Sequence, residues 1–300
     1  MPQHPIIFDR VLMRARRRRA AALGAATFLV DRVAEDFADR LATVLRRFAY
    51  ALDLGTPTDA VRRALAASGK VDNIIAVDAL ADPASVGAGL AVAADEEALA
   101  FRDGSLDLVV SALALQYVND LPGTLIQVRR ALRPDGLFLA ALAGGDTLAE
   151  LREAFAAAEA EIEGGVSPRV APFADLRELG ALLQRAGFAL PVTDVDRLTV
   201  RYATPFALMQ ELRRMGATNT LIERRRRPLR RATLVRMAEI YHERFSDPDG
   251  RIRATFEIVW LSGWAPHESQ QQPLRPGSAQ RRLADALGAE EISAGEKAKR

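Results

Sequence analysis

The segment from Phe48 to Asp59, which reads FAYALDLGTPTD, constrains the fold of this chain more than any other. An apolar run from Ala49 to Leu54 ends in Gly55, and a helical pattern over 60–67 follows. A buried strand, a tight turn and a helix in this order are typical of the first unit of a nucleotide-binding α/β fold. Such turns normally carry two or three glycines, whereas this one has a single glycine. The segment therefore predicts a fold without settling its ligand.

An acidic residue follows the next expected strand. The apolar run from Asn73 to Val77 ends in Asp78, about 23 residues after Gly55. At this spacing a carboxylate can accept hydrogen bonds from ribose hydroxyls. Asp78 could equally serve as a helix N-cap, and the residues alone leave both interpretations open.

Composition excludes several classes of site. The 300 residues are 49% hydrophobic, enough for one large core, and include no cysteine, which excludes disulfides and thiolate sites. His4, His242 and His267 do not follow a metal-ligand spacing, so we expect no metal centre. No apolar run reaches the roughly 18 residues of a transmembrane helix. We expect a cytoplasmic protein, or a mitochondrial matrix protein if the source is eukaryotic.

Strand and helix patterns alternate through the chain, which implies right-handed crossovers and a parallel sheet. Strands are expected over 49–54, 73–77, 89–93, 106–111, 137–142, 192–202 and 254–260. Helices are expected over 59–68, 121–132, 147–163, 174–186, 205–215 and 232–245, with two more in 6–47.

Three regions follow from these patterns. We expect N-terminal helices over 1–48 and a main α/β domain over 49–267, with an arginine-rich helical insertion at about 205–250. The segment 268–300 is rich in Gln, Pro, Gly and Ser, so we expect it to be mostly disordered.

Four ordered motifs give the chain a family resemblance. They are DEEALAF (95–101), GSLDLVVS (104–111), LALQYVNDLP (113–122) and LRPDGL (132–137). In sequence and spacing the chain resembles the class I S-adenosylmethionine-dependent methyltransferases. Within them it resembles the malonyl-carrier-protein methyltransferase of biotin synthesis and the methyltransferase-like assembly factors of respiratory complex I. The motif Phe8-Asp9-Arg10, Asn219 and the segment 263–269 favour the assembly factors.

The resemblance, which runs from about residue 6 to 288, implies a Rossmann-like seven-stranded, mainly parallel sheet with an antiparallel edge hairpin. It also implies S-adenosyl-L-methionine as cofactor. The positions that match cofactor contacts in the family are Asp53, Gly55, Asp78, Asp95, Ser111 and Leu113. Asp78 matches the acid that holds the ribose, and Asp95 matches the residue that reads adenine. Methyl transfer requires no fixed catalytic triad, so catalytic residues stay unassigned.

The glycine loop departs from the family pattern. Pro57 and Asp59 stand where the family has glycines. Proline lacks an amide donor and fixes φ, and a carboxylate at 59 would repel the carboxylate of the cofactor unless Arg62 or Arg63 neutralises it. We therefore expect weak binding of S-adenosylmethionine.

Four residues are candidates for the acceptor side. Gln116 and Tyr117 follow the fourth strand, at the edge where ligands bind in open α/β sheets. Arg201 and Tyr202 end the later strand. Packing at a sheet edge is the alternative for both tyrosines.

A dense basic run occupies Arg224–Arg227 with Arg230 and Arg231. It is either a solvated helix face or a docking patch for an acidic partner, such as a carrier protein or a complex I subunit. Nucleic acid is not expected, because the net charge is only +2 and no aromatic residue interleaves with these arginines.

The sequence thus predicts a methyltransferase-like protein that acts on a protein or carboxyl acceptor in the setting of complex I assembly. One alternative is a non-methylating assembly factor or an arginine hydroxylase-like binder on the same scaffold. Another is the malonyl-carrier-protein methyltransferase of biotin synthesis.

Overall fold

The computed structural model describes residues 6–80, 90–271, 278, 285, 288 and 289. The chain divides into one unit over Met1–Pro266 and a second over His267–Arg300. Most of the tail predicted for 268–300 lies outside the described residues. In the described part, no helix is long and apolar enough to cross a membrane.

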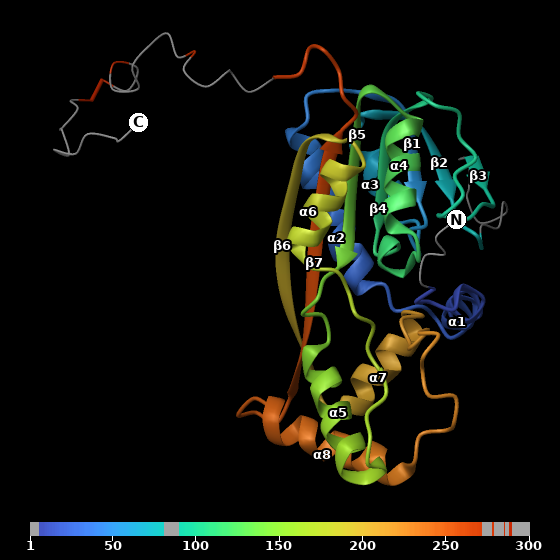
Figure 1. Cartoon of the computed structure of the whole chain (residues 1–300), viewed down its shortest axis with the longest axis vertical. Helices are drawn as coiled ribbons and strands as arrows, with labels where there is room; N and C mark the ends of the chain where they lie inside the picture. The colour runs from blue at the N-terminus through green and yellow to red at the C-terminus, as the bar shows by residue number, and fades with distance from the viewer. Residues whose placement is uncertain (1–5, 81–89, 272–277, 279–284, 286–287, 290–300) are drawn as a thin grey trace, which may run out of the picture. The chain divides into compact units, whose positions relative to one another are not determined.

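Within the described residues, seven strands form one sheet with the order β3-β2-β1-β4-β5-β7-β6 (Figure 1). The strands are β1 (Phe48–Leu54), β2 (Val71–Val77), β3 (Leu90–Val92), β4 (Leu106–Ala112), β5 (Leu132–Ala143), β6 (Ala189–Tyr202) and β7 (Ile252–Trp264). The first five are parallel, and β7 runs antiparallel to both β5 and β6. The predicted parallel sheet with an antiparallel edge hairpin is confirmed.

The helices follow the expected order with small shifts at their ends. They are α1 (Arg10–Ala22), α2 (Phe28–Thr43), α3 (Ala60–Ala67), α4 (Leu121–Ala131), α5 (Ala149–Glu163), α6 (Leu176–Arg185), α7 (Pro205–Arg214) and α8 (Arg231–Phe245), with a short 3₁₀ helix η2 (Leu115–Tyr117). Polar caps fix several starts: Asp9 accepts from the Leu12 amide at 2.9 Å, and Asp120 accepts from the Gly123 amide at 2.9 Å. These side chains satisfy amides that the first helical turn leaves unpaired.

The sheet is buried on both faces, as continuous apolar strands require. Along β4, Leu108 and Val110 face the core that includes α2, α3, α5, α7 and α8, whereas Val109 faces the core beneath α4 and α6. This alternation follows from the period of two in a strand.

The β6–β7 hairpin extends past the rest of the sheet. β7 pairs with β5 only from Ile258 to Trp264, whereas its pairing with β6 begins at Ile252. Residues 252–257 therefore belong to a two-stranded ribbon. The chain between the two strands carries α7 and α8, and α8 packs against α5 to form a helical subdomain (Figure 1).

The basic run is not the helix face that the sequence suggested. Residues 222–230 have irregular backbone and α8 begins at Arg231, because Pro228 cannot continue a helix. Arg224 pairs with Asp9 at 3.1 Å and Arg225 with Glu163 at 3.0 Å. Part of the run is thus committed to contacts within the chain.

Candidate functional site

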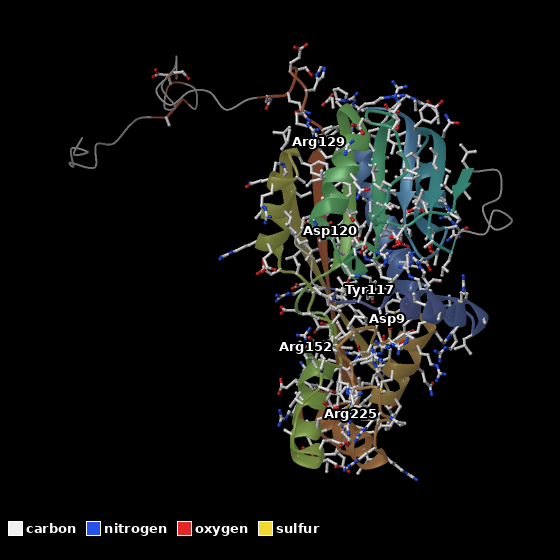
Figure 2. The ribbon with its side chains drawn as sticks, turned by 45° about the vertical axis from the view of Figure 1, so that its right-hand side comes forward. Asp9, Tyr117, Asp120, Arg129, Arg152 and Arg225 are labelled. Carbon is white, nitrogen blue, oxygen red and sulfur yellow. The ribbon has the colours of Figure 1, made fainter. Side chains whose placement is uncertain are left out.

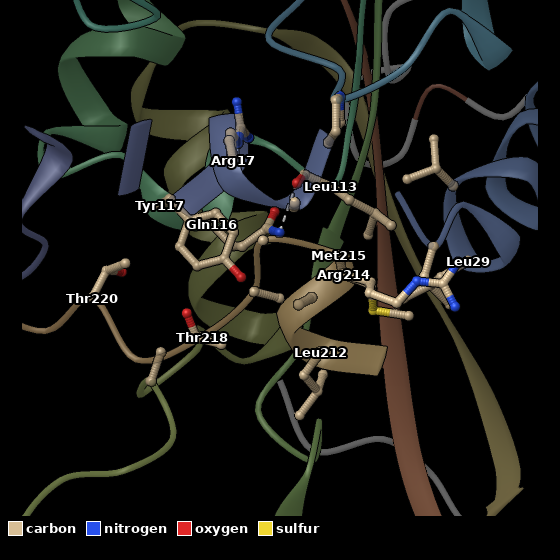
Figure 3. Close-up of a pocket in the computed structure, with 18 of the residues that line it drawn as sticks. Arg17, Leu29, Leu113, Gln116, Tyr117, Leu212, Arg214, Met215, Thr218 and Thr220 are labelled. Carbon is tan, nitrogen blue, oxygen red and sulfur yellow. Dashed lines mark hydrogen bonds between the residues drawn. The ribbon is translucent and has the colours of Figure 1, made fainter. Parts of the chain in front are cut away.

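A cavity of about 600 Å³ lies where the carboxyl ends of β1, β2 and β4 meet α1, α2, α5 and α7 (Figure 3). β1 lies between β2 and β4, so this is the switch point of the strand order, where ligands bind in open α/β sheets. Its polar end is lined by Arg17, Thr56, Arg62, Asp78, Gln116, Tyr117 and Asn219. Its apolar wall includes Leu29, Val30, Leu151, Phe155, Leu212, Met215, Phe256 and Ile258.

The loop after β1 is organised by a buried carboxylate. Asp53 is 1% exposed, accepts from the hydroxyl of Thr56 and pairs with Arg62 at 3.0 Å. Burial raises the pKa of Asp53 to about 6, against the lowering effect of Thr56 and Arg62. Asp53 does not line the cavity, whereas Thr56 does. Asp53, a predicted cofactor contact, therefore stabilises the conformation of the loop and does not itself reach the cavity.

Gly55 is required by close packing. Its φ is +71°, and a Cβ atom there would lie 2.9 Å from both Cγ and Oε1 of Glu96. A side chain at this position would therefore be strained and would collide with Glu96, which is 3% exposed. The turn is held by the Gly55 amide, which donates to the Val77 carbonyl at 2.6 Å.

The carboxylate of Asp59 points away from the cavity. It is half exposed, pairs with Arg63 and does not belong to the cavity lining. Arg63 therefore neutralises the carboxylate of Asp59, whereas Arg62 pairs with Asp53. Pro57 does line the cavity, so the loss of an amide donor there persists.

Asp78, the predicted ribose contact, lines the cavity. Its carboxylate accepts from the Leu80 amide at 2.8 Å, and its side chain is 23% exposed. The guanidinium of Arg17 lies 3.8 Å away. One face of Asp78 thus stays accessible to a ligand.

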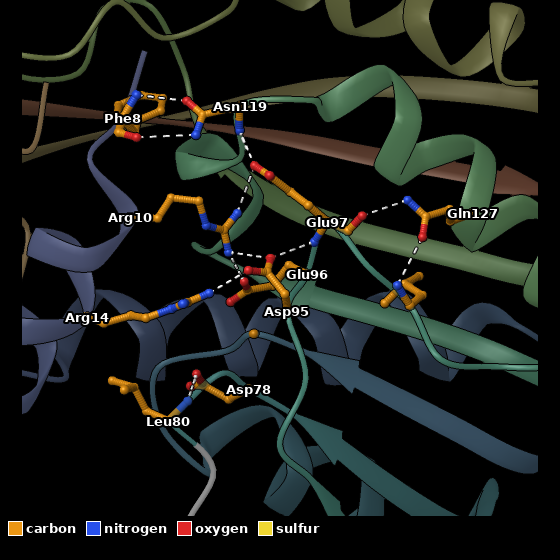
Figure 4. A network of polar contacts seen from close by, with 12 residues as sticks. Phe8, Arg10, Arg14, Asp78, Leu80, Asp95, Glu96, Glu97, Asn119 and Gln127 are labelled. Carbon is orange, nitrogen blue, oxygen red and sulfur yellow. Dashed lines mark hydrogen bonds and ion pairs between the residues drawn. The ribbon is translucent and has the colours of Figure 1, made fainter. Parts of the chain in front are cut away.

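Asp95 is held by α1 and does not line the cavity (Figure 4). Arg10 lies 2.9 Å and Arg14 lies 2.5 Å from its carboxylate, and its other bond is from the Glu97 amide at 2.9 Å. Asp95, which matches the adenine contact of the family, is therefore already bound by other residues of this chain.

Ser111 and Leu113 have different roles. The fully buried hydroxyl of Ser111 donates to the Leu54 carbonyl at 2.7 Å and so ties β4 to β1. Leu113 lines the cavity with φ +52°, a left-handed conformation that costs energy for a branched side chain. Leu148, with φ +56°, is a second strained leucine in the cavity wall.

Gln116 and Tyr117 face the cavity, close to Thr218 (Figure 3). The Gln116 amide nitrogen donates to the Leu113 carbonyl at 2.8 Å, and its oxygen is buried without a hydrogen-bond partner among the described residues. The Tyr117 ring packs edge-on against Phe8 and Phe173, at the junction between the sheet and the helical subdomain (Figure 2). Burial raises the pKa of Tyr117, so its hydroxyl stays protonated at neutral pH.

Arg201 and Tyr202 do not join the cavity lining. Arg201 pairs with Asp247 at 2.8 Å, and Tyr202 is buried at the end of β6. Both lie on the ribbon where β6 has run past the carboxyl edge of the sheet. This placement does not support the predicted acceptor-side role.

Sequence reasoning missed Arg17, Thr56 and Glu96. A usable signal was present in α1, because Arg10, Arg14 and Arg17 recur at helical spacing on one face. Nothing local in the sequence distinguishes Glu96 from its acidic neighbours. Among the residues that the structure describes, no group of three metal-ligating side chains is arranged to hold an ion.

Known proteins share this architecture. A family model described as a methyltransferase domain matches residues 52–140. The solved structures of Bacillus halodurans BH2331 and Bacillus subtilis YcgJ superpose with TM-scores of 0.53 and 0.52, at 15% and 18% identity, covering 77% and 79% of this chain and 98% and 99% of theirs. These two likenesses establish the fold alone.

Sequence relatives are more informative. The chain is 41% identical over 280 residues to the human protein named "Arginine-hydroxylase NDUFAF5, mitochondrial", covering 91% of this chain and 81% of the relative. The zebrafish protein of that name is 36% identical over 287 residues, covering 93% and 89%. The malonyl-[acyl-carrier protein] O-methyltransferase of Gallionella capsiferriformans is 39% identical over 179 residues, covering 59% and 58%. This chain therefore belongs to the NDUFAF5 family, on a methyltransferase-like scaffold.

Proposed function

We propose that this chain binds S-adenosyl-L-methionine at the carboxyl edge of its sheet and modifies a side chain of a protein partner. The observation that carries this proposal is that Asp78, Gln116 and Tyr117, which follow two different strands, line one cavity of about 600 Å³. A volume of this size suits a nucleoside together with part of an acceptor.

The residues present fit the cofactor. Asp78 would accept from the ribose hydroxyls, and Thr56 with Arg62 would face the amino-acid end, where a guanidinium suits a carboxylate. Leu113 would pack against the base. When bound, the cofactor supplies an electrophilic methyl group. The partly exposed carboxylate of Asp78 supports this assignment.

The acceptor side has to orient its substrate and exclude water. The apolar side chains of Leu151, Phe155 and Leu212 would cover an aliphatic stem. Gln116 would fix the acceptor through its unsatisfied carbonyl oxygen, which needs an N–H or O–H donor. Tyr117 stays protonated and would donate to an acceptor atom.

The setting we propose is the assembly of respiratory complex I, which the family resemblance implies. A subunit of that complex would be the partner. The named relatives are described as mitochondrial, so we propose the mitochondrial matrix, or the cytoplasm of a bacterium. Exposed arginines of the basic run, Arg226, Arg227 and Arg231, would attract acidic partner surfaces.

Arginine hydroxylation is the second candidate. It is favoured by the extent of the sequence match, because the human arginine hydroxylase relative aligns with 91% of this chain, whereas the malonyl-carrier-protein methyltransferase of Gallionella capsiferriformans aligns with 59%. Hydroxylation would insert one oxygen atom into a substrate bond and would require dioxygen and a reductant.

Calorimetry with S-adenosylmethionine and S-adenosylhomocysteine tests the cofactor. Asp78→Asn should weaken binding about tenfold or more, because the ribose loses a charge-assisted acceptor. The matched control is Asp72→Asn, an exposed residue of the same strand that pairs with Arg47 on the surface. Equal affinities of the two variants would remove Asp78 from the site.

Mass spectrometry of a captured complex I subunit distinguishes the two reactions. With isotope-labelled methyl in the cofactor, methyl transfer places the label on the partner. Hydroxylation adds the mass of one oxygen atom and no label. A partner that stays unmodified in the presence of the cofactor, dioxygen and a reductant would contradict both reactions and support a non-catalytic assembly role.

A further inference from the structure

One face of α1 carries three arginines, Arg10, Arg14 and Arg17, spaced by four and three residues. Side chains at this spacing project from the same side of a helix. Arg10 and Arg14 meet the run Asp95–Glu97, which lies outside the cavity lining (Figure 4). Arg17 lies near Asp78, the one acidic residue among the described residues that line the cavity.

Arg10 and Arg14 make the close contacts. Arg10 lies 2.9 Å from both Asp95 and Glu97 and also pairs with Glu96, and its side chain is only 11% exposed. Although burial would lower the pKa of Arg10, the neighbouring carboxylates raise it above its ordinary value. Ion pairs in such surroundings are screened little by salt, so these two arginines anchor the helix.

Arg17 is held differently. Its guanidinium lies 3.5 Å from the Gly55 carbonyl oxygen, 3.8 Å from Asp78 and 3.9 Å from Glu96. These distances exceed those of good charge-assisted hydrogen bonds, which are about 2.7–2.9 Å. Arg17 therefore lies among three weak partners inside the cavity lining without closing onto any of them.

The backbone of α1 is fixed at the same point. A Cβ atom at Gly216, which follows α7 with φ +73°, would lie 3.2 Å from the Cα atom of Arg17. The helix is thus packed between the sheet edge and the helical subdomain. It can leave Asp78 only if the Arg17 side chain swings away or the helix separates from both.

We propose that α1 is an autoinhibitory latch: Arg10 and Arg14 anchor the helix, and Arg17 competes with a nucleoside for Asp78 at the polar end of the cavity. This inference rests on the cofactor site proposed above. Arg17 lies on one side of Asp78, so a ribose would have to compete with it there, and its positive charge would disfavour a cationic ligand nearby. Ligand binding and attachment of α1 therefore oppose each other.

Affinity for S-adenosylhomocysteine and S-adenosylmethionine, measured by calorimetry, tests the latch. Arg10→Gln with Arg14→Gln and Arg17→Gln should tighten binding about tenfold, which is about 1.4 kcal/mol. Arg17→Gln alone keeps both anchors, which protects the fold, and should tighten binding about threefold, more for the cationic ligand than for the neutral one. The control is Arg19→Gln, an exposed arginine of α1 outside the cavity lining, which should change neither affinity.

Hydrogen exchange gives an independent readout. In the unmodified protein, saturating S-adenosylhomocysteine should speed exchange of the α1 amides and leave those of α4 unchanged. Slower exchange in α1, or weaker binding by Arg17→Gln, would overturn the latch and make Arg17 a ligand contact.

The pattern of results separates the two proposals. If the unmodified protein binds and neither arginine variant binds more tightly, the cofactor site stands and the latch is wrong. If only the arginine variants bind a nucleoside, both the cofactor site and the latch are supported. If no form binds either nucleoside, the cofactor proposal fails and the latch fails with it.

Discussion

The two ends of the cavity differ in how deeply the charged side chains around them are buried. Next to the polar end, outside the cavity lining, Glu96 is 3% exposed and meets Arg10, so charges are buried against charges. The helical subdomain turns apolar side chains such as Phe155 and Leu212 inward and carries ion pairs such as Arg244–Glu153 outside, where both side chains are about half exposed. Buried pairs depend on every partner, whereas exposed pairs are nearly dispensable.

This difference indicates a division of labour. The polar end can discriminate ligands, because Arg17, Arg62 and Asp78 line it and a polar group left without its partner is costly. Charges on the outside of the helical subdomain can be replaced at little cost to the fold. The inner surface of the subdomain sets the shape of the cavity. The predictions below probe this contrast by removing charges from each end.

The largest effect is expected at Glu96. Glu96→Ala removes a partner of the mostly buried Arg10, and breaking a buried ion pair costs about 3–5 kcal/mol. The free energy of unfolding, measured with urea, should fall by an amount in this range. A loss below about 1 kcal/mol would mean that Asp95 and Glu97 suffice, and the contrast between the two ends would weaken.

The next effect concerns pH and Asp53. Its pKa is raised to about 6 in the folded protein, above the ordinary value of 3.8, chiefly by burial. The unfolded chain therefore loses this proton at lower pH than the folded one. The contribution of Asp53 to the free energy of unfolding is largest below about pH 4. It falls by up to about 3 kcal/mol as the pH rises through 6.

Asp53→Asn checks this sign. The difference in unfolding free energy between the variant and the unmodified protein should shift in favour of the variant between pH 4 and 7. Parallel pH profiles of the two proteins would show that Arg62 and Thr56 hold the carboxylate ionised throughout.

The smallest effect is expected on the outside of the helical subdomain. Glu153→Gln removes one partner of the exposed Arg244, and should change the unfolding free energy by about 0.5 kcal/mol or less. Raising the salt concentration should abolish even this difference. A loss of several kcal/mol would contradict the dispensability of these surface charges.

The sequence could predict the fold because its signals are local. Apolar runs that end in Gly55 and Asp78 place both residues at the same sheet edge, and Gln116 with Tyr117 follows the next strand. The carboxyl ends of parallel strands must meet, so their convergence on one cavity needs no long-range information.

The rest depends on contacts between distant segments. Arg10 and Glu96 are 86 residues apart, and nothing local signals that they meet. The role of Asp95 was misplaced for the same reason, because Arg14 of the N-terminal helix holds it. Arg201 was predicted at the acceptor side because the apolar pattern of β6 does not reveal that this strand extends past the edge of the sheet.

The position of β7 also has a consequence for how the chain is made. Of the strands that the structure describes, β7 is synthesised last and lies between β5 and β6, so it fills an interior place in the sheet. Until residues up to Trp264 have left the ribosome, β5 presents an unpaired edge to its surroundings. Domains that depend on such late pairing fold slowly and are exposed to aggregation during synthesis. The nascent protein should therefore need protection by chaperones until β7 has been synthesised and has paired with β5.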